Sequence, residues 1–437
     1  MAEKPHRVVI VGGGFGGLTA ARALRDTPVQ VTLIDKRNFH LFQPLLYQVA
    51  TGLLSPSEIA SPLRHILKDQ ENAHVLMGEV TDLDPSQRRV IMNDGEVEYD
   101  TLIMAAGMIN HYYGHDEWRN YAPGLKTIED SARIRQRIFY AFEVAEREPD
   151  PEIRREWMSF VVIGSGATGV ELSGMIAEIA INTLKGEFRN IRPEEAKVLL
   201  LDAADRILPT FPRGLSRLTV KSLNRLGVCT RTNAKVIEIY DKGVTIETHG
   251  GKERIPSRTV FWASGVTASP LGKTLAERTG AGTDRSGRVI VNPNLTIPGH
   301  PEIFVLGDLA HLEEKEGKPL PGLAPVAAQQ GRYAARVVRK RLEGLPESKP
   351  FSYFDKGTMA VIGRNSAVAN IGSLRFGGRF AWLLWLFIHL LLLIKFENKL
   401  IVFIRWAFQY ISYNRGARHL MLRGPLTLPI SPERKKP

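Results

Sequence analysis

The chain has 437 residues, 43% of them hydrophobic and 24% charged, so it is long enough for two or three domains with a substantial core. Its single cysteine, Cys229, excludes an internal disulfide and a redox centre made of paired cysteines. The 11 histidines form no ligand-like cluster, so no metal site is expected.

The N-terminus leads directly into a dinucleotide fingerprint. Residues 1–7 contain no apolar signal core, so we expect a protein that is not secreted and faces the cytoplasm. The apolar run 8–11 is followed by the glycine-rich residues 12–17 and then by a helix-like stretch. Such glycines let a pyrophosphate approach the backbone at a helix N-terminus. Asp35 ends the next apolar run and is a candidate for the ribose hydroxyls, the alternative being a simple strand end.

A second fingerprint occupies residues 164–169, after the apolar run 160–163. Asp202 ends the following apolar run, as Asp35 does in the first copy. A carboxylate there repels a 2′-phosphate and so favours NADH over NADPH, although Arg206 would soften that preference. Two fingerprints in one chain predict two dinucleotides, with electrons passing between them.

Strand-like runs follow each fingerprint and end in small residues, at 100–107 and at 258–265. This repetition predicts that the second unit is inserted into the first. A further apolar run, residues 302–306, ends in Gly307 and Asp308. A Gly-Asp pair after a strand is by itself usually a turn.

The most apolar part of the chain is residues 380–394, followed by a second apolar stretch at 400–411. A 15-residue helix rises about 22 Å, too short for a bilayer core of roughly 30 Å. Aromatic and basic residues around these runs are typical of helices that lie in the lipid interface. We therefore expect one or two helices in the surface of the cytoplasmic leaflet. The alternatives are a buried helix at a homodimer interface and, less favoured, a spanning helix.

The positive charge of the chain, +12 overall, is concentrated in this tail. Residues 371–437 contain eleven Lys or Arg and only two acidic residues, Glu397 and Glu433. Because the cations alternate with apolar runs, they indicate an anionic lipid surface and not a nucleic acid.

Taken together, these motifs resemble the type II, non-proton-pumping NADH:quinone oxidoreductases over essentially the whole chain. Residues 38–50 are similar to the stretch with which this family covers its flavin, and residues 168–172 to its nucleotide helix. Residues 320–331 correspond to the start of its quinone-proximal helix, and the tail to its membrane-docking helices. Pro325 replaces a glutamine found in much of the family, so quinone binding is expected to differ there.

The resemblance implies an α/β fold with two Rossmann-like domains and a membrane-docking C-terminal segment. It implies a non-covalent FAD-binding domain at 1–115 and 270–345, an NADH-binding domain at 116–269, and a membrane-associating region at 346–437. FAD would be held by Gly12, Gly14, Gly17, Asp35, Gly107 and Asp308, and NADH by Gly164, Gly166, Gly169 and Asp202. Further cofactor-binding candidates are Phe15, Gly16, Lys36, Gly265, Gly307, Val326 and Ala327.

Hydride would pass from NADH to the flavin, and two electrons would then pass to a membrane quinone. Glu171 is the candidate proton relay, since burial beside a cofactor would raise its pKa; the alternatives are a solvated or capping glutamate, or a group that orients NADH. Gln329 is the candidate quinone-side group, the alternative being a polar residue in the first turn of a helix.

Three other functions compete with this one. A flavin reductase of a protein acceptor such as ferredoxin would not need the apolar tail. A sulfide:quinone oxidoreductase would need thiols that the chain lacks. A membrane-associated NADH-responsive redox sensor is not excluded by any motif.

Overall fold

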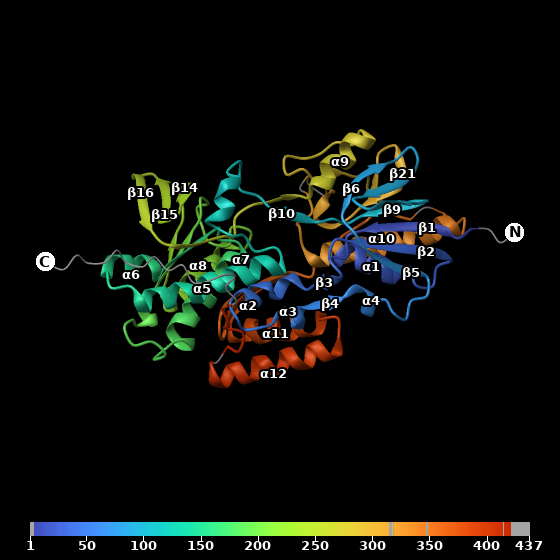
Figure 1. Cartoon of the computed structure of the whole chain (residues 1–437). Coiled ribbons are helices and arrows are strands. Elements are labelled where there is room, and N and C mark those ends of the chain that lie inside the picture. Colours follow the sequence, from blue (N-terminus) through green and yellow to red (C-terminus); the bar gives the residue numbers. More distant parts are fainter. Residues whose placement is uncertain (1–3, 314–316, 318, 347, 414, 421–437) are drawn as a thin grey trace. The chain divides into compact units, whose positions relative to one another are not determined.

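The computed structural model describes residues 4–313, 317, 319–346, 348–413 and 415–420. The chain divides into two compact units (Figure 1). Of the described residues, those within 1–41, 60–111 and 266–356 form the first unit, and those within 42–59, 112–265 and 357–437 form the second. The tail residues Arg423, Glu433, Arg434, Lys435 and Lys436, counted above for their charge, lie outside the described residues.

The first unit is built on a six-stranded sheet with the order β20-β21-β9-β1-β2-β5. All neighbours in it pair in parallel except β20 and β21. Residues 8–11 of β1 are buried, as expected for a central strand of a parallel sheet. The strand bounds are β1 (His6–Val11), β2 (Val29–Asp35), β5 (Ala73–Met77), β9 (Thr101–Met104), β20 (Thr296–Ile297) and β21 (His300–Val305).

Helices and small sheets complete this unit. The main helices are α1 (Phe15–Ala23), α4 (Leu63–Ile66), α9 (Pro270–Thr279) and α10 (Ala324–Leu342), with a 3-10 turn η5 (Gly307–Leu309). The small sheets are β3 (Phe39–Leu41) with β4 (Ala60–Pro62); β6 (Val80–Asp84), β7 (Arg89–Met92) and β8 (Gly95–Glu98); β10 (Met108–Asn110) with β18 (Val266–Ala268); and β19 (Val289–Ile290) with β22 (Ala310–His311).

The second unit repeats the parallel arrangement in a four-stranded sheet with the order β13-β12-β11-β17. Its strands are β11 (Ser159–Ile163), β12 (Lys197–Leu201), β13 (Val228–Arg231) and β17 (Thr259–Trp262), and a separate meander contains β14 (Lys235–Tyr240), β15 (Gly243–Thr248) and β16 (Gly251–Pro256). The helices are α2 (Leu46–Ala50), α3 (Pro56–Ile59), α5 (Ile128–Arg147), α6 (Pro151–Trp157), α7 (Ala167–Glu178) and α8 (Arg213–Arg225), with a π-helical turn η3 (Ile179–Thr183) and 3-10 turns η1 (Gln43–Leu45), η2 (Asp116–Asn120) and η4 (Pro193–Glu195).

The C-terminal part of the second unit forms an antiparallel sheet followed by two helices. The elements are β23 (Thr358–Gly363), β24 (Ser366–Ile371), β25 (Leu374–Gly378), α11 (Arg379–Leu392) and α12 (Phe396–Ser412). The sheet packs so closely on α7 that a Cβ on Gly174 would lie 1.7 Å from the carbonyl oxygen of Ile362. In the described part of the chain, no helix combines the length and the apolar character that crossing a bilayer requires.

The expected fold class is confirmed. Each parallel sheet has its glycine fingerprint between its first strand, β1 or β11, and the helix that follows, α1 or α7, and the last two helices of the described chain are α11 and α12.

Candidate dinucleotide sites and C-terminal helices

The first fingerprint has the three glycines of the G-x-G-x-x-G pattern at Gly12, Gly14 and Gly17, and the structure shows a different reason for glycine at each. Gly12 has φ +107°, and a Cβ there would lie 2.4 Å from the Ala105 carbonyl oxygen. A Cβ on Gly17 would lie 1.9 Å from the Gly12 carbonyl oxygen, so only glycine allows α1 to pack here. Gly14 caps α1, and its Cβ would have none of the described atoms within 4 Å. The open space therefore lies where free N–H groups begin the helix.

The second fingerprint repeats this geometry with a different sequence. Gly164 has φ +104°, and its Cβ would lie 2.6 Å from the Ala263 carbonyl oxygen. A Cβ on Gly169 would lie 1.8 Å from the Gly164 carbonyl oxygen, whereas one on Gly166, the cap of α7, would meet no described atom within 4 Å. Two loops that are closed at the first and third glycine and open at the second fit the pyrophosphate of a dinucleotide.

Both candidate ribose carboxylates brace their own fingerprint loop. Asp35 accepts the Gly13 N–H at 2.6 Å and the Arg37 N–H at 2.8 Å. Asp202 accepts the Ser165 N–H at 2.5 Å and the Ser165 hydroxyl at 2.6 Å. Each carboxylate has further lone pairs, so these bonds leave it able to accept from a ribose hydroxyl as well.

Asp308 lies in η5, directly after the inner strand β21. Its neighbour Gly307, with φ +66°, donates its N–H to the buried side-chain oxygen of Gln330 at 2.6 Å. A Cβ on Gly322 would lie 3.2 Å from the Asp308 carboxyl group, so the backbone before α10 forms one wall beside that carboxylate. Sequence reasoning singled out Gln329 and missed Gln330, because adjacent glutamines give no signal of which one faces inward.

Helices α1 and α10 pack face to face in the same unit. A Cβ on Gly331 would lie 2.3 Å from the Gly16 carbonyl oxygen, and one on Gly16 would lie 3.4 Å from that of Ala327. Val326 is buried in the first turn of α10, and the Phe15 ring packs edge-on against His40, 5.0 Å between centroids. This packing brings the candidates on α1 and α10 together beside the first fingerprint.

For the remaining cofactor candidates, the structure gives backbone angles and local contacts. Gly107 and Gly265 both have positive φ angles, +68° and +81°, at the ends of the two strand-like runs. The Lys36 ammonium is half exposed and lies 3.8 Å from the Glu79 carboxylate. The Arg206 guanidinium donates to the Pro209 carbonyl and is thus engaged locally.

Glu171 lies in α7, two residues after Gly169. Burial raises the pKa of Glu171 to about 8, while a 3.4 Å hydrogen bond from the Val361 N–H opposes that shift. A carboxyl group with such a pKa exchanges protons near neutral pH, as a proton relay requires.

Gln329 is in the second turn of α10, and its amide is bonded to the backbone of its own unit. Its Nε2 donates to the Phe354 carbonyl at 2.9 Å, and its Oε1 accepts the Phe354 N–H at 3.0 Å. One amide N–H is left for any further acceptor. Pro325 lies in the first turn of α10, where its missing N–H costs little.

Helix α12 is joined to the short helices α2 and α3 by polar contacts. The Trp406 indole N–H donates to Gln48 Oε1 at 2.8 Å, and Gln48 Nε2 donates to the Tyr47 hydroxyl at 3.0 Å. The Arg405 guanidinium lies 3.1 Å from the buried Glu58 carboxylate. Trp385 of α11 is buried, and its ring centroid lies 6.3 Å from that of Tyr47.

The opposite faces of α11 and α12 are exposed and apolar. Phe387 is 59% exposed, Phe403 55% and Ile411 81%. The same exposed set includes Phe380, Leu383, Leu391, Leu392, Phe396, Leu400, Ile401, Ile404 and Phe408.

Three of the cations counted in the tail, Arg405, Arg415 and Arg418, are paired with acidic side chains. Arg415 is buried; its Nη1 donates to the Thr51 carbonyl at 3.0 Å, and its Nη2 lies 3.6 Å from the Glu178 carboxylate. Arg405 pairs with Glu58, and Arg418 with Glu187 at 2.7 Å. These three cations pair with acids far away in the sequence, and Arg415, because it is buried, does not face a lipid surface.

Comparisons with known proteins agree with the fold and its motifs. The model of the pyridine nucleotide-disulphide oxidoreductase family matches residues 6–331, and the model of the NDH2 C-terminal domain matches residues 356–412. Two relatives from Mycobacterium tuberculosis are type II NADH:quinone oxidoreductases NdhA and Ndh. They are 47% and 45% identical, over 94% of this chain and 88% and 89% of theirs.

A solved structure of NDH2 from Plasmodium falciparum in complex with NADH covers 96% of this chain and 100% of its own, with a TM-score of 0.83. At 20% identity, that likeness concerns the fold alone. The match of the curated relatives along nearly the whole chain decides the family. The chain belongs to the type II NADH:quinone oxidoreductases.

Proposed function

We propose that this chain oxidises NADH and delivers two electrons, through a bound FAD, to a membrane quinone without pumping protons. The observation that carries the proposal is the pair of fingerprint loops, each open only at its second glycine, at Gly14 and at Gly166. Each loop also has a carboxylate, Asp35 or Asp202, hydrogen-bonded beside it.

The first fingerprint is assigned to FAD, in a domain made of residues 1–115 and 270–345. The α1 N-terminus would hold the pyrophosphate, Asp35 the adenosine ribose, and Asp308 the ribitol. FAD held there would supply the redox chemistry, taking up the hydride of NADH and passing two electrons to a quinone. The small residues Gly16 and Gly307 let Ala327 approach closely and so bring the first turns of α10 beside this loop.

The second fingerprint is assigned to NADH, in residues 116–269. Asp202 would accept hydrogen bonds from the adenosine ribose and repel a 2′-phosphate. The local hydrogen bond of Arg206 to Pro209 supports a preference for NADH, because that guanidinium is already engaged.

Glu171 is proposed to exchange the protons that quinone reduction requires. Its pKa of about 8 supports this role, because the protonated carboxyl group can donate and the carboxylate can be reprotonated near neutral pH. Gln329 is proposed as a quinone-side group with a single free amide N–H, a weaker role than the sequence suggested.

The exposed apolar faces of α11 and α12 are proposed to dock residues 346–437 on the cytoplasmic face of the membrane. Each helix buries one tryptophan, Trp385 or Trp406, and presents phenylalanines on its other face. This arrangement is typical of helices that lie in the lipid interface. A homodimer that covers the same faces is the competing outcome, and vesicle binding by a monomeric protein would exclude it.

Steady-state assays test the proposal. Detergent-purified protein should oxidise NADH with a short-chain quinone as acceptor, at well above about 1 per second, and much more slowly with NADPH. Turnover only with a ferredoxin, or no turnover at all, would overturn it in favour of a reductase of a protein acceptor or a redox sensor.

A further inference from the structure

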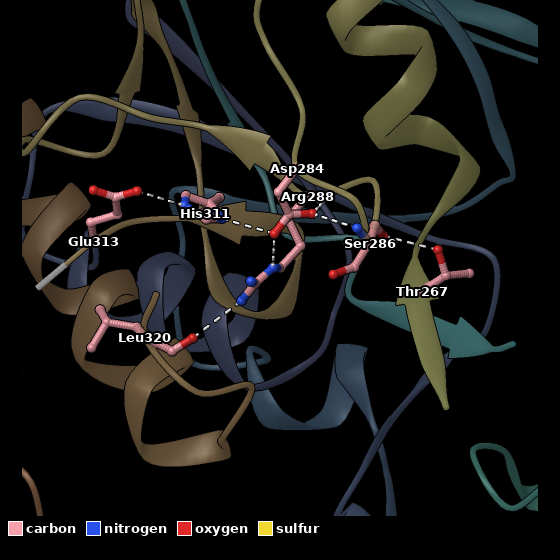
Figure 2. Close-up of polar contacts among 7 residues, drawn as sticks. All are labelled: Thr267, Asp284, Ser286, Arg288, His311, Glu313 and Leu320. Atoms are coloured by element: carbon pink, nitrogen blue, oxygen red, sulfur yellow. Dashed lines mark hydrogen bonds and ion pairs between the residues drawn. The ribbon is translucent and has the colours of Figure 1, made fainter. Parts of the chain in front are cut away.

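A polar network in the first unit joins the loop 284–288 to His311 and Leu320 (Figure 2). Its centre is Asp284, which accepts the N–H of Ser286 at 2.8 Å and the Nε–H of Arg288 at 2.7 Å. His311 Nδ1 lies 2.8 Å from the same carboxylate, and His311 Nε2 lies 3.4 Å from Glu313. The side chains of Asp284, Arg288 and His311 are only 13–14% exposed.

Two connections link the network to backbone segments that neighbour Asp308. Along the first, His311 belongs to β22, which begins directly after η5 and pairs in parallel with β19, so the loop 284–288 is fixed beside the strand that follows Asp308. Along the second, Arg288 Nη1 donates to the Leu320 carbonyl at 3.3 Å. Leu320 leads two residues later to Gly322, the backbone wall beside the Asp308 carboxylate.

The two partners of Arg288, the Asp284 carboxylate and the Leu320 carbonyl, show why arginine suits position 288. Its planar guanidinium reaches an anion and a neutral carbonyl at the same time, which a lysine ammonium on a flexible stem does less well. Hydrogen bonds from His311 and Arg288, together with the Arg288 charge, hold the pKa of Asp284 at about 2 despite its burial, so the carboxylate keeps its charge over the working pH range.

We propose that Arg288, held by Asp284, is a positioning residue of the flavin site: it fixes the segment 320–322 against Asp308 and thereby orients that carboxylate toward the ribitol. This proposal rests on the assignment of Asp308 to FAD made above. Neither Arg288 nor Asp284 would touch the cofactor.

The test measures FAD affinity of the full-length chain after reversible removal of the flavin, by titration with FAD and its fluorescence. Arg288→Leu should raise the FAD dissociation constant about tenfold, as expected for the loss of a charge-assisted hydrogen bond, and Arg288→Lys should restore part of it. Amide hydrogen exchange at residues 320–323 should be faster in Arg288→Leu. The matched control is Arg278→Leu, which removes the Arg278–Asp82 ion pair of the same unit (Nε to Oδ1, 3.0 Å) and should leave FAD affinity unchanged.

Asp308→Ala separates this inference from the assignment beneath it. If Asp308→Ala leaves FAD affinity unchanged, the flavin role of Asp308 is wrong. If it weakens FAD while Arg288→Leu and Arg288→Lys do not, the flavin role stands and the positioning role of Arg288 is overturned. A double variant combines Asp308→Ala with Arg288→Leu. If its loss of FAD affinity is no larger than that of Asp308→Ala alone, the proposal is supported; if the two losses add, the proposal is contradicted.

Discussion

Replacing Gly14 or Gly166 by alanine should separate the two dinucleotide sites without harming the fold. Both glycines have extended backbone angles that alanine adopts freely, φ −71° and ψ −165° at Gly14 and φ −64° and ψ −179° at Gly166. Neither added methyl group would meet a described atom within 4 Å. Because alanine also restricts the unfolded chain, each variant should be as stable as the parent or more stable by about 0.4–1 kcal/mol.

The same two substitutions should weaken dinucleotide binding. A methyl group there would stand between the helix N-terminus and a pyrophosphate, and the displaced anion would lose a charge-assisted hydrogen bond of about 1.5–3 kcal/mol. At 1.4 kcal/mol per factor of ten, binding should weaken roughly 10- to 150-fold.

The assay distinguishes the sites. Gly14→Ala should lower FAD content and raise the FAD dissociation constant, and Gly166→Ala should raise KM for NADH while the bound flavin spectrum stays the same. Gly17→Ala and Gly169→Ala serve as comparators, since a Cβ there would lie 1.9 and 1.8 Å from a carbonyl oxygen and should destabilise the chain. If Gly14→Ala instead weakened NADH binding and Gly166→Ala weakened FAD binding, the two sites would have to be assigned the other way round. Unchanged binding in both variants would show that the pyrophosphates do not lie at these two glycines.

Three further predictions concern single groups. Asp202→Ala should bring the kcat/KM for NADPH closer to that for NADH; an unchanged ratio would remove Asp202 from the nucleotide site. Because the pKa of Glu171 is raised from 4.5 to about 8, native stability should fall as pH rises from about 5 to 8. Glu171→Gln should flatten that fall in denaturant titrations and slow flavin reoxidation by quinone more than flavin reduction by NADH in stopped flow; equal slowing of the two half-reactions would speak against a relay. Phe387→Asp with Phe403→Asp should weaken binding to anionic vesicles by roughly 100-fold, while Leu345→Asp, also at an exposed apolar residue, should not; unaltered sedimentation with vesicles would disprove docking through these faces.

Local features of the sequence predicted the fold and the dinucleotide loops well. The positions of Gly12, Gly17 and Asp35 follow from short-range rules, because a strand, a tight turn and a helix N-terminus need only adjacent residues. The apolar runs at 380–394 and 400–411 likewise predicted α11 and α12.

What the sequence could not predict depends on partners distant along the chain. Arg415 counts as a surface cation by composition, yet Glu178, more than 200 residues earlier, pairs with it in the interior. Trp406 has the composition of a lipid-interface residue but donates to Gln48 inside the second unit. Deletion from Phe380 onward would therefore uncover buried residues, and the exposed-face substitutions are the cleaner test of docking.

We propose that one chain carries electrons from NADH through FAD to a quinone. The most direct test records flavin absorbance near 450 nm in purified protein during anaerobic addition of NADH and then of a short-chain quinone. We expect bleaching by NADH and rapid, full recovery with quinone. Bleaching without recovery would contradict the assignment of quinone as acceptor, and absence of bleaching would contradict the assignment of NADH as donor.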